Sequence, residues 1–432
     1  MDFLFNISPL VKFALIFVMI IVLIRQKLSL GAALTIGAII LGLWFRLSPF
    51  KVCVSVIDSL TSIETIILFL VITLILVLSH SLETSGQMRR LLNSFEGISR
   101  NTRLNLALFP AIIGLLPMPG GAVFSAPMVY EISRKEDLSA RRKALINYWF
   151  RHIWEFFWPL YPGVILTCAL SGIDMGTFIL IQFPLTPFMA CVGYFTLLRS
   201  VPVQKELAPR PPTGDRRRFL VELLPILIVV GGAIIFGTVI YIIGNVWAPF
   251  KEVRKEIPLI TALITSLFWV WRYNRMTVMD IKAIFLNKSL LSMLFMIAGI
   301  MIFQGVLKDS HAVSEISQSL TSARVPVILV IVILPFLVGT VTGISVAFVG
   351  ATFPIIFSLI ADTPMTDQLH AYTVLAFCSG YLGVLLSPLH VCLVLTCEYF
   401  HTTLMQIYRR LLFPSAILAG GALLSFWINR LL

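Results

Sequence analysis

The chain has 432 residues, of which 58% are apolar and only 12% are charged, and its mean hydropathy is +0.95. Soluble domains are about 45–50% apolar and about 25% charged, so this composition excludes a soluble enzyme, a disordered chain and a fibrous repeat. It predicts an all-α polytopic membrane protein. The net charge of +12 lies in short loops, which favours contact with membrane lipids over a nucleic-acid partner.

The first apolar run follows Asp2 rather than a cluster of positive charge, and no small-residue cleavage site follows the run. We therefore expect a retained helix and not a signal peptide. The six cysteines form no C-x-x-C pair and mostly lie inside apolar runs. Neither a disulfide framework nor a metal site is expected from this pattern.

Eight apolar segments suit simple membrane crossings, since a helix needs about 20 residues to span the hydrocarbon. Two further segments, 145–171 and 369–397, are interrupted by polar residues and proline, so about ten transmembrane helices are expected in total. The simple crossings are expected near 8–26, 28–46, 62–80, 174–198, 219–246, 256–272, 288–307 and 408–429.

Two uncharged stretches fit a simple crossing badly. Stretch 325–361 is too long for one crossing and too short for two crossings with a turn, and stretch 104–130 has two prolines and two glycines in its middle. Stretch 104–130 contains L-P-M-P-G-G at 116–121, and stretch 325–361 contains G-T-V-T-G-I-S at 339–345. Proline and glycine break helices, and non-helical backbone at membrane depth is tolerated only where protein or water satisfies it. The sequence therefore predicts two re-entrant hairpins, with a single long, kinked helix as the alternative in each case.

The chain resembles itself at an offset near 225, which places Pro110 on Pro335, and at 229, which places Pro159 on Pro388. Each half would hold five crossings and one hairpin, and an odd number of crossings inverts the second half relative to the first. We therefore expect two inverted-topology repeats. The first covers 1–200, a cytoplasmic linker covers 201–218, and the second repeat covers 219–432.

The distribution of Lys and Arg orients these segments. Alternating the crossings from the N-terminus places 23 of these residues on one side and nine on the other. Positive residues collect on the cytoplasmic side. The protein is therefore expected to be a multi-pass protein of the cell inner membrane with both termini outside.

Three sequence blocks carry a resemblance to a known family. They are P-M-P-G-G-A-V-F-S-A-P at 117–127, G-T-V-T-G-I-S-V-A-F-V-G at 339–350 and G-Y-L-G-V-L-L-S-P-L-H at 380–390. They resemble an uncharacterised prokaryotic integral-membrane family, a domain of unknown function. That family is similar to the ion-transporter superfamily of gluconate permeases, citrate and dicarboxylate carriers, and Na⁺/H⁺ antiporters. The resemblance implies a scaffold domain, a mobile transport domain, a homodimer and elevator-type alternating access.

Four breaks in the apolar segments are candidate substrate-binding positions, because helix N-termini favour anions and C-terminal carbonyls favour Na⁺ or H₃O⁺. Glycines there allow close approach of the backbone and hydroxyls supply hydrogen bonds, although small residues also serve helix packing alone. The candidates at the two hairpin tips and at the second broken helix are Pro119, Gly120, Gly121, Ser125, Thr340, Thr342, Gly343, Ser345 and Ser387.

Arg151, His152 and Glu155 lie inside the apolar segment 145–171, where ionisable residues are costly and usually functional. Arg151 could pair with Glu155 one turn further on, bind a substrate carboxylate with two hydrogen bonds, or extend to the cytoplasmic headgroups. His152, Glu155 and His390 are candidates for carrying a coupling proton. A purely structural histidine is the alternative for His390.

These features predict a secondary active transporter of a small organic anion of the carboxylate type, coupled to H⁺ or Na⁺ and needing no other cofactor. A cation/proton antiporter is the main alternative, and an intramembrane enzyme or a passive channel are further ones. The chain has no H-E-x-x-H, G-x-S-x-G or P-loop motif, so catalytic residues are not expected. The expected partners are membrane lipids, the transported anion and a second copy of the chain.

Overall fold

The computed structural model describes residues 7–95, 99, 101–118, 120–134, 138–201, 215–246, 253–322, 324–361 and 364–431. All regular secondary structure in these residues is helical. Five helical stretches are long and apolar enough to cross a membrane, and seven shorter helices are also apolar. The all-helical class is thereby confirmed and the apolar helices indicate a membrane protein, while the count of about ten crossings stays a prediction.

The first half of the chain holds helices α2 to α12. Their bounds are α2 Pro9–Arg25, α3 Leu30–Trp44, α4 Pro49–Thr61, α5 Ile63–Thr84, α6 Gln87–Phe95, α7 Thr102–Gly114, α8 Ala122–Ile132, α9 Ala140–Arg151, α10 Pro162–Ser171, α11 Met175–Gln182 and α12 Leu185–Gly193, continued by a π-helical turn at Tyr194–Leu198.

The second half holds helices α13 to α22, and a 3₁₀ turn at Pro364–Gln368 precedes α20. Their bounds are α13 Arg216–Val246, α14 Ile257–Tyr273, α15 Val278–Phe285, α16 Lys288–Asp309, α17 Ala312–Ser322, α18 Val327–Thr342, α19 Ser345–Ala361, α20 Leu369–Leu385, α21 Val391–Tyr399 and α22 Leu404–Leu431. Most of the expected linker 201–218 lies outside the described residues.

Local sequence signals account for many helix ends. The side chains of Ser29, Ser62 and Asn101 accept backbone N–H groups in the first turns of α3, α5 and α7, which satisfies donors that have no partner within the helix. Gly172 and Gly343 end α10 and α18 in the left-handed conformation, where a residue without Cβ is least strained.

The helices are interrupted at the four predicted places. Separate helices α7 and α8, and α18 and α19, flank the two glycine-rich tips, while α9 and α10, and α20 and α21, flank the two polar, proline-containing patches. Proline has no N–H to donate and disfavours helix in the residue before it. The re-entrant course of α7–α8 and α18–α19 through a membrane stays a prediction.

Four short helices, α4, α6, α15 and α17, lie outside the expected simple crossings. Charged or polar residues such as Lys51 and Asp58 in α4 interrupt their apolar runs. A search for segments of about 20 apolar residues therefore misses them. Each of the four nevertheless packs on a longer neighbour, as α4 does on α16.

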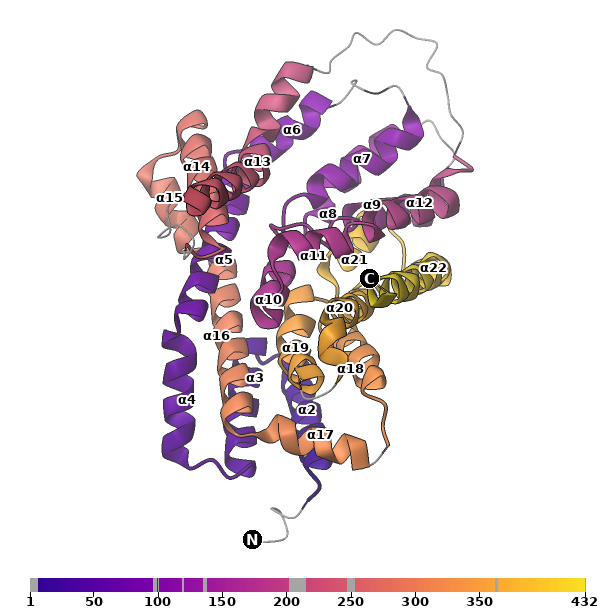
Figure 1. Ribbon diagram of the computed structural model, residues 1–432. Helices are drawn as coiled ribbons and strands as arrows, with labels where there is room; N and C mark the ends of the chain where they lie inside the picture. Colours follow the sequence, from indigo (N-terminus) through magenta and orange to yellow (C-terminus); the bar gives the residue numbers. More distant parts are fainter. Residues whose placement is uncertain are drawn as a thin grey trace.

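The helices form two groups, and each group draws on both halves of the chain (Figure 1). The first group is defined as α2–α6 with α13–α17, in which α16 packs on α3, α4 and α5. The second group is defined as α7–α12 with α18–α22, in which α7 packs on α9 and α18 packs on α20. The groups meet where α19 contacts α16 and α17 and where α10 contacts α5. One cluster of buried apolar side chains lies wholly within the second group.

The order and spacing of the helices recur along the chain. Helices α5, α6 and α7 begin at positions 63, 87 and 102, and α16, α17 and α18 begin at 288, 312 and 327, so each pair is separated by the offset of 225. Helices α9, α10 and α11 begin at positions 140, 162 and 175, and α20, α21 and α22 begin at 369, 391 and 404, so each pair is separated by the offset of 229. These are the two offsets at which the sequence resembles itself.

Candidate functional site

The break between α9 and α10 is held against the end of α7 by tryptophan side chains. Trp154 Nε1 donates to the Ala111 carbonyl at 2.8 Å, and Trp158 Nε1 donates to the Leu115 carbonyl at 2.9 Å. Carbonyls in the last turn of a helix have no partner within that helix. The two indoles satisfy such groups, and they fix the first broken helix on the first arm of the predicted hairpin.

Arg151, the last residue of α9, points into the protein interior with only 2% of its surface exposed. One terminal nitrogen, Nη2, donates to the Met118 carbonyl at 2.7 Å, and Nη1 lies 3.5 Å from His152 Nε2. A Cβ added at Gly121 would overlap with Nη2. The hairpin tip therefore cradles the guanidinium, and glycine at position 121 makes room for it.

The Arg151 guanidinium forms no ion pair with a carboxylate in the part of the chain that the structure describes. No carboxylate there lies within 4.0 Å of its nitrogens, and its Nε atom is buried without a hydrogen-bond partner. Burying an unpaired charge is costly. The side chain does not extend to the molecular surface, as contact with lipid headgroups would require, and its free donor capacity suits an anion.

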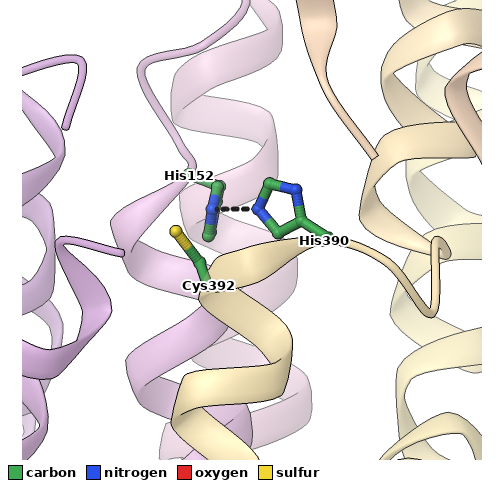
Figure 2. Close-up of side chains that lie close together, drawn as sticks. All are labelled: His152, His390 and Cys392. Carbon is green, nitrogen blue, oxygen red and sulfur yellow. Dashed lines mark hydrogen bonds between the residues drawn. The ribbon is translucent and has the colours of Figure 1, made fainter. Parts of the chain in front are cut away.

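Two histidines from different halves of the chain meet, as Figure 2 shows, and one of them lies beside Arg151. His152 follows the last residue of α9, and His390 precedes the first residue of α21. Their Nε2 atoms lie 2.9 Å apart, and both side chains are buried. The first broken helix and the second broken helix therefore touch through this pair.

Each of these histidines has its other ring nitrogen on a backbone carbonyl. His152 Nδ1 lies 2.5 Å from the Tyr148 carbonyl, and His390 Nδ1 lies 2.7 Å from the Gly343 carbonyl. A carbonyl only accepts hydrogen bonds, so both Nδ1 atoms carry protons, and in the neutral rings both Nε2 atoms are acceptors. Two acceptors that face each other at 2.9 Å call for a positive ion or a donated proton between them.

Glu155 and Cys392 lie beside Arg151 and the two histidines, and we call these five residues the central cluster. Glu155 Oε1 lies 3.8 Å from His152 Nε2, and the carboxylate is buried. The Cys392 sulfur and a ring nitrogen of each histidine all lie within 4.8 Å of one another. The sequence pattern gave no sign of Cys392, because His390 and Cys392 are two positions apart and their partner His152 is distant in the chain. Only its place directly after the predicted break could have indicated it.

The candidates at the first hairpin tip have different surroundings. Gly120 has a φ of +75° and lies against α21, since a Cβ there would meet Leu395 at 3.0 Å. Ser125 is one turn inside α8, and its hydroxyl donates to Asn147 Oδ1 at 2.6 Å instead of facing Arg151. Pro119 lies outside the described residues.

At the second tip, several hydroxyls already have partners. Thr340 and Thr342 donate to carbonyls of their own helix, at Phe336 and Val338. Such bonds leave the oxygen lone pairs but not the hydroxyl proton available to a ligand. The half-buried Ser345 lies against the start of α10, where a Cβ added at Gly163 would meet its Oγ at 3.0 Å.

The structure therefore gathers only some of the candidates. Those that lie within or directly against the central cluster are Gly121, Arg151, His152, Glu155, Gly343, Ser387 and His390. Ser125, Thr340, Thr342 and Ser345 lie on adjoining helices with the partners given above. No ligand contact tests the substrate-binding role of any of them, so these roles stay predictions.

One hydrogen bond at the first break has a counterpart at the second. Trp158 Nε1 donates to the Leu115 carbonyl at 2.9 Å, and Ser387 Oγ donates to the Thr340 carbonyl at 2.7 Å. Thr340 follows Leu115 at the offset of 225, and Ser387 follows Trp158 at the offset of 229. The two breaks therefore make the same side-chain-to-carbonyl contact with different residues.

A close approach of backbones recurs in the same way. A Cβ added at Gly114 would overlap with the carbonyl oxygen of Arg151, and a Cβ added at Gly339 would overlap with that of Gly380. Gly339 and Gly380 follow Gly114 and Arg151 at the offsets of 225 and 229. Glycine is required at both positions for α7 to approach α9, and α18 to approach α20, at this distance.

A cavity of about 550 Å³ lies between the two helix groups and reaches the first break at Pro159. Apolar side chains of α5, α10, α11, α13 and α14 line most of it, and charged residues, among them Glu64, Arg254 and Lys255, also border it. Arg151, His152, Glu155, His390 and Cys392 are not among its lining residues.

Comparison with known proteins places the chain in a family but gives it no activity. A search of curated proteins finds no match to the sequence. A family model described as "Protein of unknown function (DUF401)" matches residues 8–428, which is nearly the whole chain. This chain, with its broken helices and buried Arg151, therefore belongs to the DUF401 family of proteins of unknown function.

Proposed function

We propose that this protein is a secondary active transporter of a small organic anion, with Arg151 as the residue that binds the anion's carboxylate. The observation that carries the proposal is the buried, unpaired guanidinium. Arg151 has 2% of its surface exposed, a free Nε and no carboxylate within ion-pair distance among the described residues. A guanidinium matches a carboxylate through two parallel hydrogen bonds.

Two helix N-termini near Arg151 support the choice of an anion. Helix α8 begins directly after Gly121, which is packed against the guanidinium, and α21 begins directly after His390. Helices α8 and α21 also pack on each other. The N-terminus of a helix carries a partial positive charge, and its first N–H groups have no partner within the helix. An anion beside Arg151 would be stabilised by both termini.

The recurring contacts support an inverted-topology repeat. Three features recur at the two offsets of 225 and 229. They are the first residues of the helices, the hydrogen bonds that Trp158 and Ser387 donate to carbonyls, and the close backbone approaches at Gly114 and Gly339. In addition, α8 packs on α21 of the other half, and α10 packs on α19. Helices of one repeat thus pack on helices of the other repeat. In secondary transporters, two inverted repeats that meet in this way form a central site that opens to each side of the membrane in turn. We accordingly place the chain in the ion-transporter superfamily.

The two helix groups support a division of labour. The second group holds all four breaks and has a buried core of its own, and the cavity near Pro159 lies at its boundary with the first group. We propose that the second group is the mobile transport domain and that the first is the scaffold, arranged as a homodimer with elevator-type movement. The protein would then span the cell inner membrane in about ten crossings, with both termini outside.

The driving ion is proposed to be H⁺ or Na⁺. His152, Glu155 and His390 lie close enough to Arg151 for an ion bound there to influence an anion on the guanidinium. A gradient experiment can separate the two ions without an assumption about which residue carries the charge.

Uptake by reconstituted vesicles tests the proposal. Proteoliposomes are loaded so that a pH gradient or a Na⁺ gradient is imposed separately, and labelled mono-, di- and tricarboxylates are offered outside. We expect uptake of at least one carboxylate above the gradient-free level, abolished by the matching ionophore and by Arg151→Ala. Arg199→Ala removes an exposed arginine and serves as the matched control, with unchanged uptake.

The other functional classes give different results in the same vesicles. Exchange of Na⁺ for H⁺ without any anion would indicate a cation/proton antiporter. Uptake that only follows the anion's own gradient and is insensitive to ionophores would indicate a channel. Chemical conversion of a substrate by the detergent-solubilised protein would indicate an enzyme. Each of these results would contradict the proposed function.

A further inference from the structure

We infer that His152, His390 and Cys392 form a binding site for a transition-metal ion of the Zn²⁺ class, with the Glu155 carboxylate nearby. This inference goes beyond the proposed transport function and does not depend on it. The cysteine pattern of the sequence predicts no metal site, because that pattern looks for ligands close together in the chain. Here the fold brings together residues from the two halves.

The orientation of the two histidine rings is that of metal ligands. In most metal sites the ligating histidine donates its other N–H to a carbonyl or a carboxylate, which fixes the tautomer and the ring orientation. His152 and His390 both do this, through the carbonyls of Tyr148 and Gly343. Both Nε2 atoms are thereby left unprotonated and face the same space, with Arg151 Nη1 also 3.5 Å from His152 Nε2.

The ligand atoms are close enough to share one ion. The two Nε2 atoms lie 2.9 Å apart, and the Cys392 sulfur joins them within 4.8 Å (Figure 2). Zn²⁺ binds nitrogen at about 2.0–2.1 Å and sulfur at about 2.3 Å. An ion between the three atoms therefore requires only small side-chain shifts. It also relieves the repulsion between the two nitrogen lone pairs.

The charges around the cluster are compatible with a divalent cation. Cys392 would bind as a thiolate, and Glu155 Oε1 lies 3.8 Å from His152 Nε2. These two negative groups offset the ion's charge, and Arg151 contributes one further positive charge. Imidazole and thiolate ligands favour Zn²⁺ and similar late transition metals over Mg²⁺ or Ca²⁺.

Metal titration of the purified full-length chain tests the inference. The protein is prepared in detergent with an affinity tag that contains no histidine, stripped with a chelator, and titrated with Co²⁺ as a spectroscopic probe for the Zn²⁺ site. We expect one ion per chain, a sulfur-to-cobalt charge-transfer band, and displacement of Co²⁺ by Zn²⁺. X-ray absorption of the Zn²⁺-loaded wild type should show one sulfur and two or three nitrogen or oxygen neighbours.

Single substitutions assign the ligands. Cys392→Ser should abolish the charge-transfer band, and His152→Ala or His390→Ala should weaken Co²⁺ binding by about 100-fold or more, since loss of a mere supporting residue costs about 10–100-fold. Cys397→Ser, on the same helix α21 and also buried, is the matched control and should leave both unchanged.

Three results would overturn the metal site. They are a wild-type protein that binds no Co²⁺ or Zn²⁺, a charge-transfer band that survives in Cys392→Ser, and a zinc absorption spectrum without a sulfur neighbour. The absorption measurement needs no variant, so it decides the question even if a substitution prevents folding. Because none of these assays involves a carboxylate or an ion gradient, failure here leaves the transport proposal standing, and failure of transport leaves the metal site standing.

Discussion

The two broken helices share a backbone arrangement but differ in their chemistry. At equivalent positions the first break carries Arg151 and Trp158, and the second carries Gly380 and Ser387. At each break a side chain donates a hydrogen bond to a carbonyl at the end of the first hairpin helix, α7 or α18. A glycine of that same helix packs against the backbone of the broken helix. Only the first contributes a buried cation and a buried carboxylate, whereas the second contributes His390 and Cys392 to the shared cluster.

This difference separates architecture from function. Contacts that set the path of the backbone recur in both halves, because the same helix crossing needs the same close approach twice. Groups that could bind a charged ligand need occur only once, because both breaks face one central site. Substitutions at the recurring contacts should therefore lower stability by similar amounts in the two halves. Substitutions at the charged groups should weaken ligand binding, and the equivalent positions in the other half should show no such effect.

The largest effect is expected from Arg151→Ala. We expect it to weaken binding of a transported carboxylate by about 30-fold or more, since removing one partner of a buried charge pair costs about 2–5 kcal/mol. Arg151→Lys should restore only part of the affinity, because an ammonium lacks the planar pair of donors. The measurement is the carboxylate-induced rise in melting temperature of the detergent-solubilised protein.

The matched control for this prediction is Arg199→Ala, which removes an exposed charge. An unchanged carboxylate-induced shift in folded Arg151→Ala would reject the assignment of Arg151 as the anion ligand.

Substitution of the close-approach glycines should have the next largest effect, and the effect should be similar in the two halves. Gly114→Ala and Gly339→Ala each place a methyl group on a carbonyl oxygen, of Arg151 and Gly380 respectively. Overpacking of this kind costs about 1–3 kcal/mol, so both variants should melt at clearly lower temperature. Thermal unfolding followed by intrinsic tryptophan fluorescence measures this loss.

Gly420→Ala is the control for the glycine variants, because a Cβ there meets no atom within 4 Å. It should be neutral or slightly stabilising, since alanine favours helix over glycine. If only one of Gly114→Ala and Gly339→Ala were destabilising, the equivalence of the two breaks would be wrong.

The paired hydrogen bonds should contribute less. Trp158→Phe and Ser387→Ala each remove one donor, from the Leu115 and Thr340 carbonyls respectively, and a buried hydrogen bond is worth about 1 kcal/mol. We expect comparable drops in melting temperature. Trp427→Phe, at an exposed tryptophan, and Ser319→Ala, whose hydroxyl donates only to its own helix, are the controls. Controls as destabilised as the test variants would contradict a role for these two bonds.

The smallest expected effect is a difference in pH dependence between two equivalent helix caps. Asp174 Oδ2 accepts the Thr177 N–H at 2.8 Å before α11, and Thr403 Oγ1 accepts the Gln406 N–H at 3.4 Å at the start of α22. Burial raises the pKa of Asp174, but hydrogen bonds from Thr177 lower it more, so the pKa lies below its usual value. Only the first cap can therefore be weakened by acid.

A depressed carboxyl pKa stabilises the fold above the unfolded-state value of about 3.9, and this contribution is lost as the pH falls through the folded pKa. Between about pH 5 and pH 3, the free energy of unfolding of wild type should therefore fall by about 0.5 kcal/mol more than that of Asp174→Asn. This value is the lower end of the stabilisation expected of a helix N-cap, because solvent screens this exposed carboxylate. Thr403→Asn should leave the pH slope unchanged. Equal slopes for wild type and Asp174→Asn would contradict the capping assignment.

The sequence was sufficient to locate the breaks, because glycine and proline determine local backbone geometry regardless of what surrounds them. L-P-M-P-G-G at 116–121 and G-T-V-T-G-I-S at 339–345 interrupt helices in the structure as expected. Arg151 was singled out for a similar reason, since a charge inside an apolar segment is conspicuous in any fold. Its burial speaks against extension to the lipid headgroups, because the side chain does not reach the surface, while its role in binding a carboxylate stays a prediction.

Other parts of the site depend on tertiary contacts that no local pattern encodes. Cys392 joins His152 only because α21 packs against α9. The hydroxyls of Thr340 and Thr342 were expected at the site, but they donate to their own helix, a common outcome for threonine within a helix. The short helix α4 was missed because its charged residues interrupt the apolar run.

The most direct test of the central claim uses Cys392, which lies in the cluster next to Arg151. A protein whose other five cysteines are replaced by alanine is stripped of metal ions with a chelator, so that Cys392 is a free thiol, and is reconstituted in oriented vesicles. Small charged thiol reagents that do not cross the membrane are applied from each side in turn. The account predicts modification of Cys392 from both sides, slowed from both sides by the transported carboxylate. Modification from one side only, at a rate that the carboxylate does not change, would contradict alternating access to an anion site at the meeting point of the broken helices.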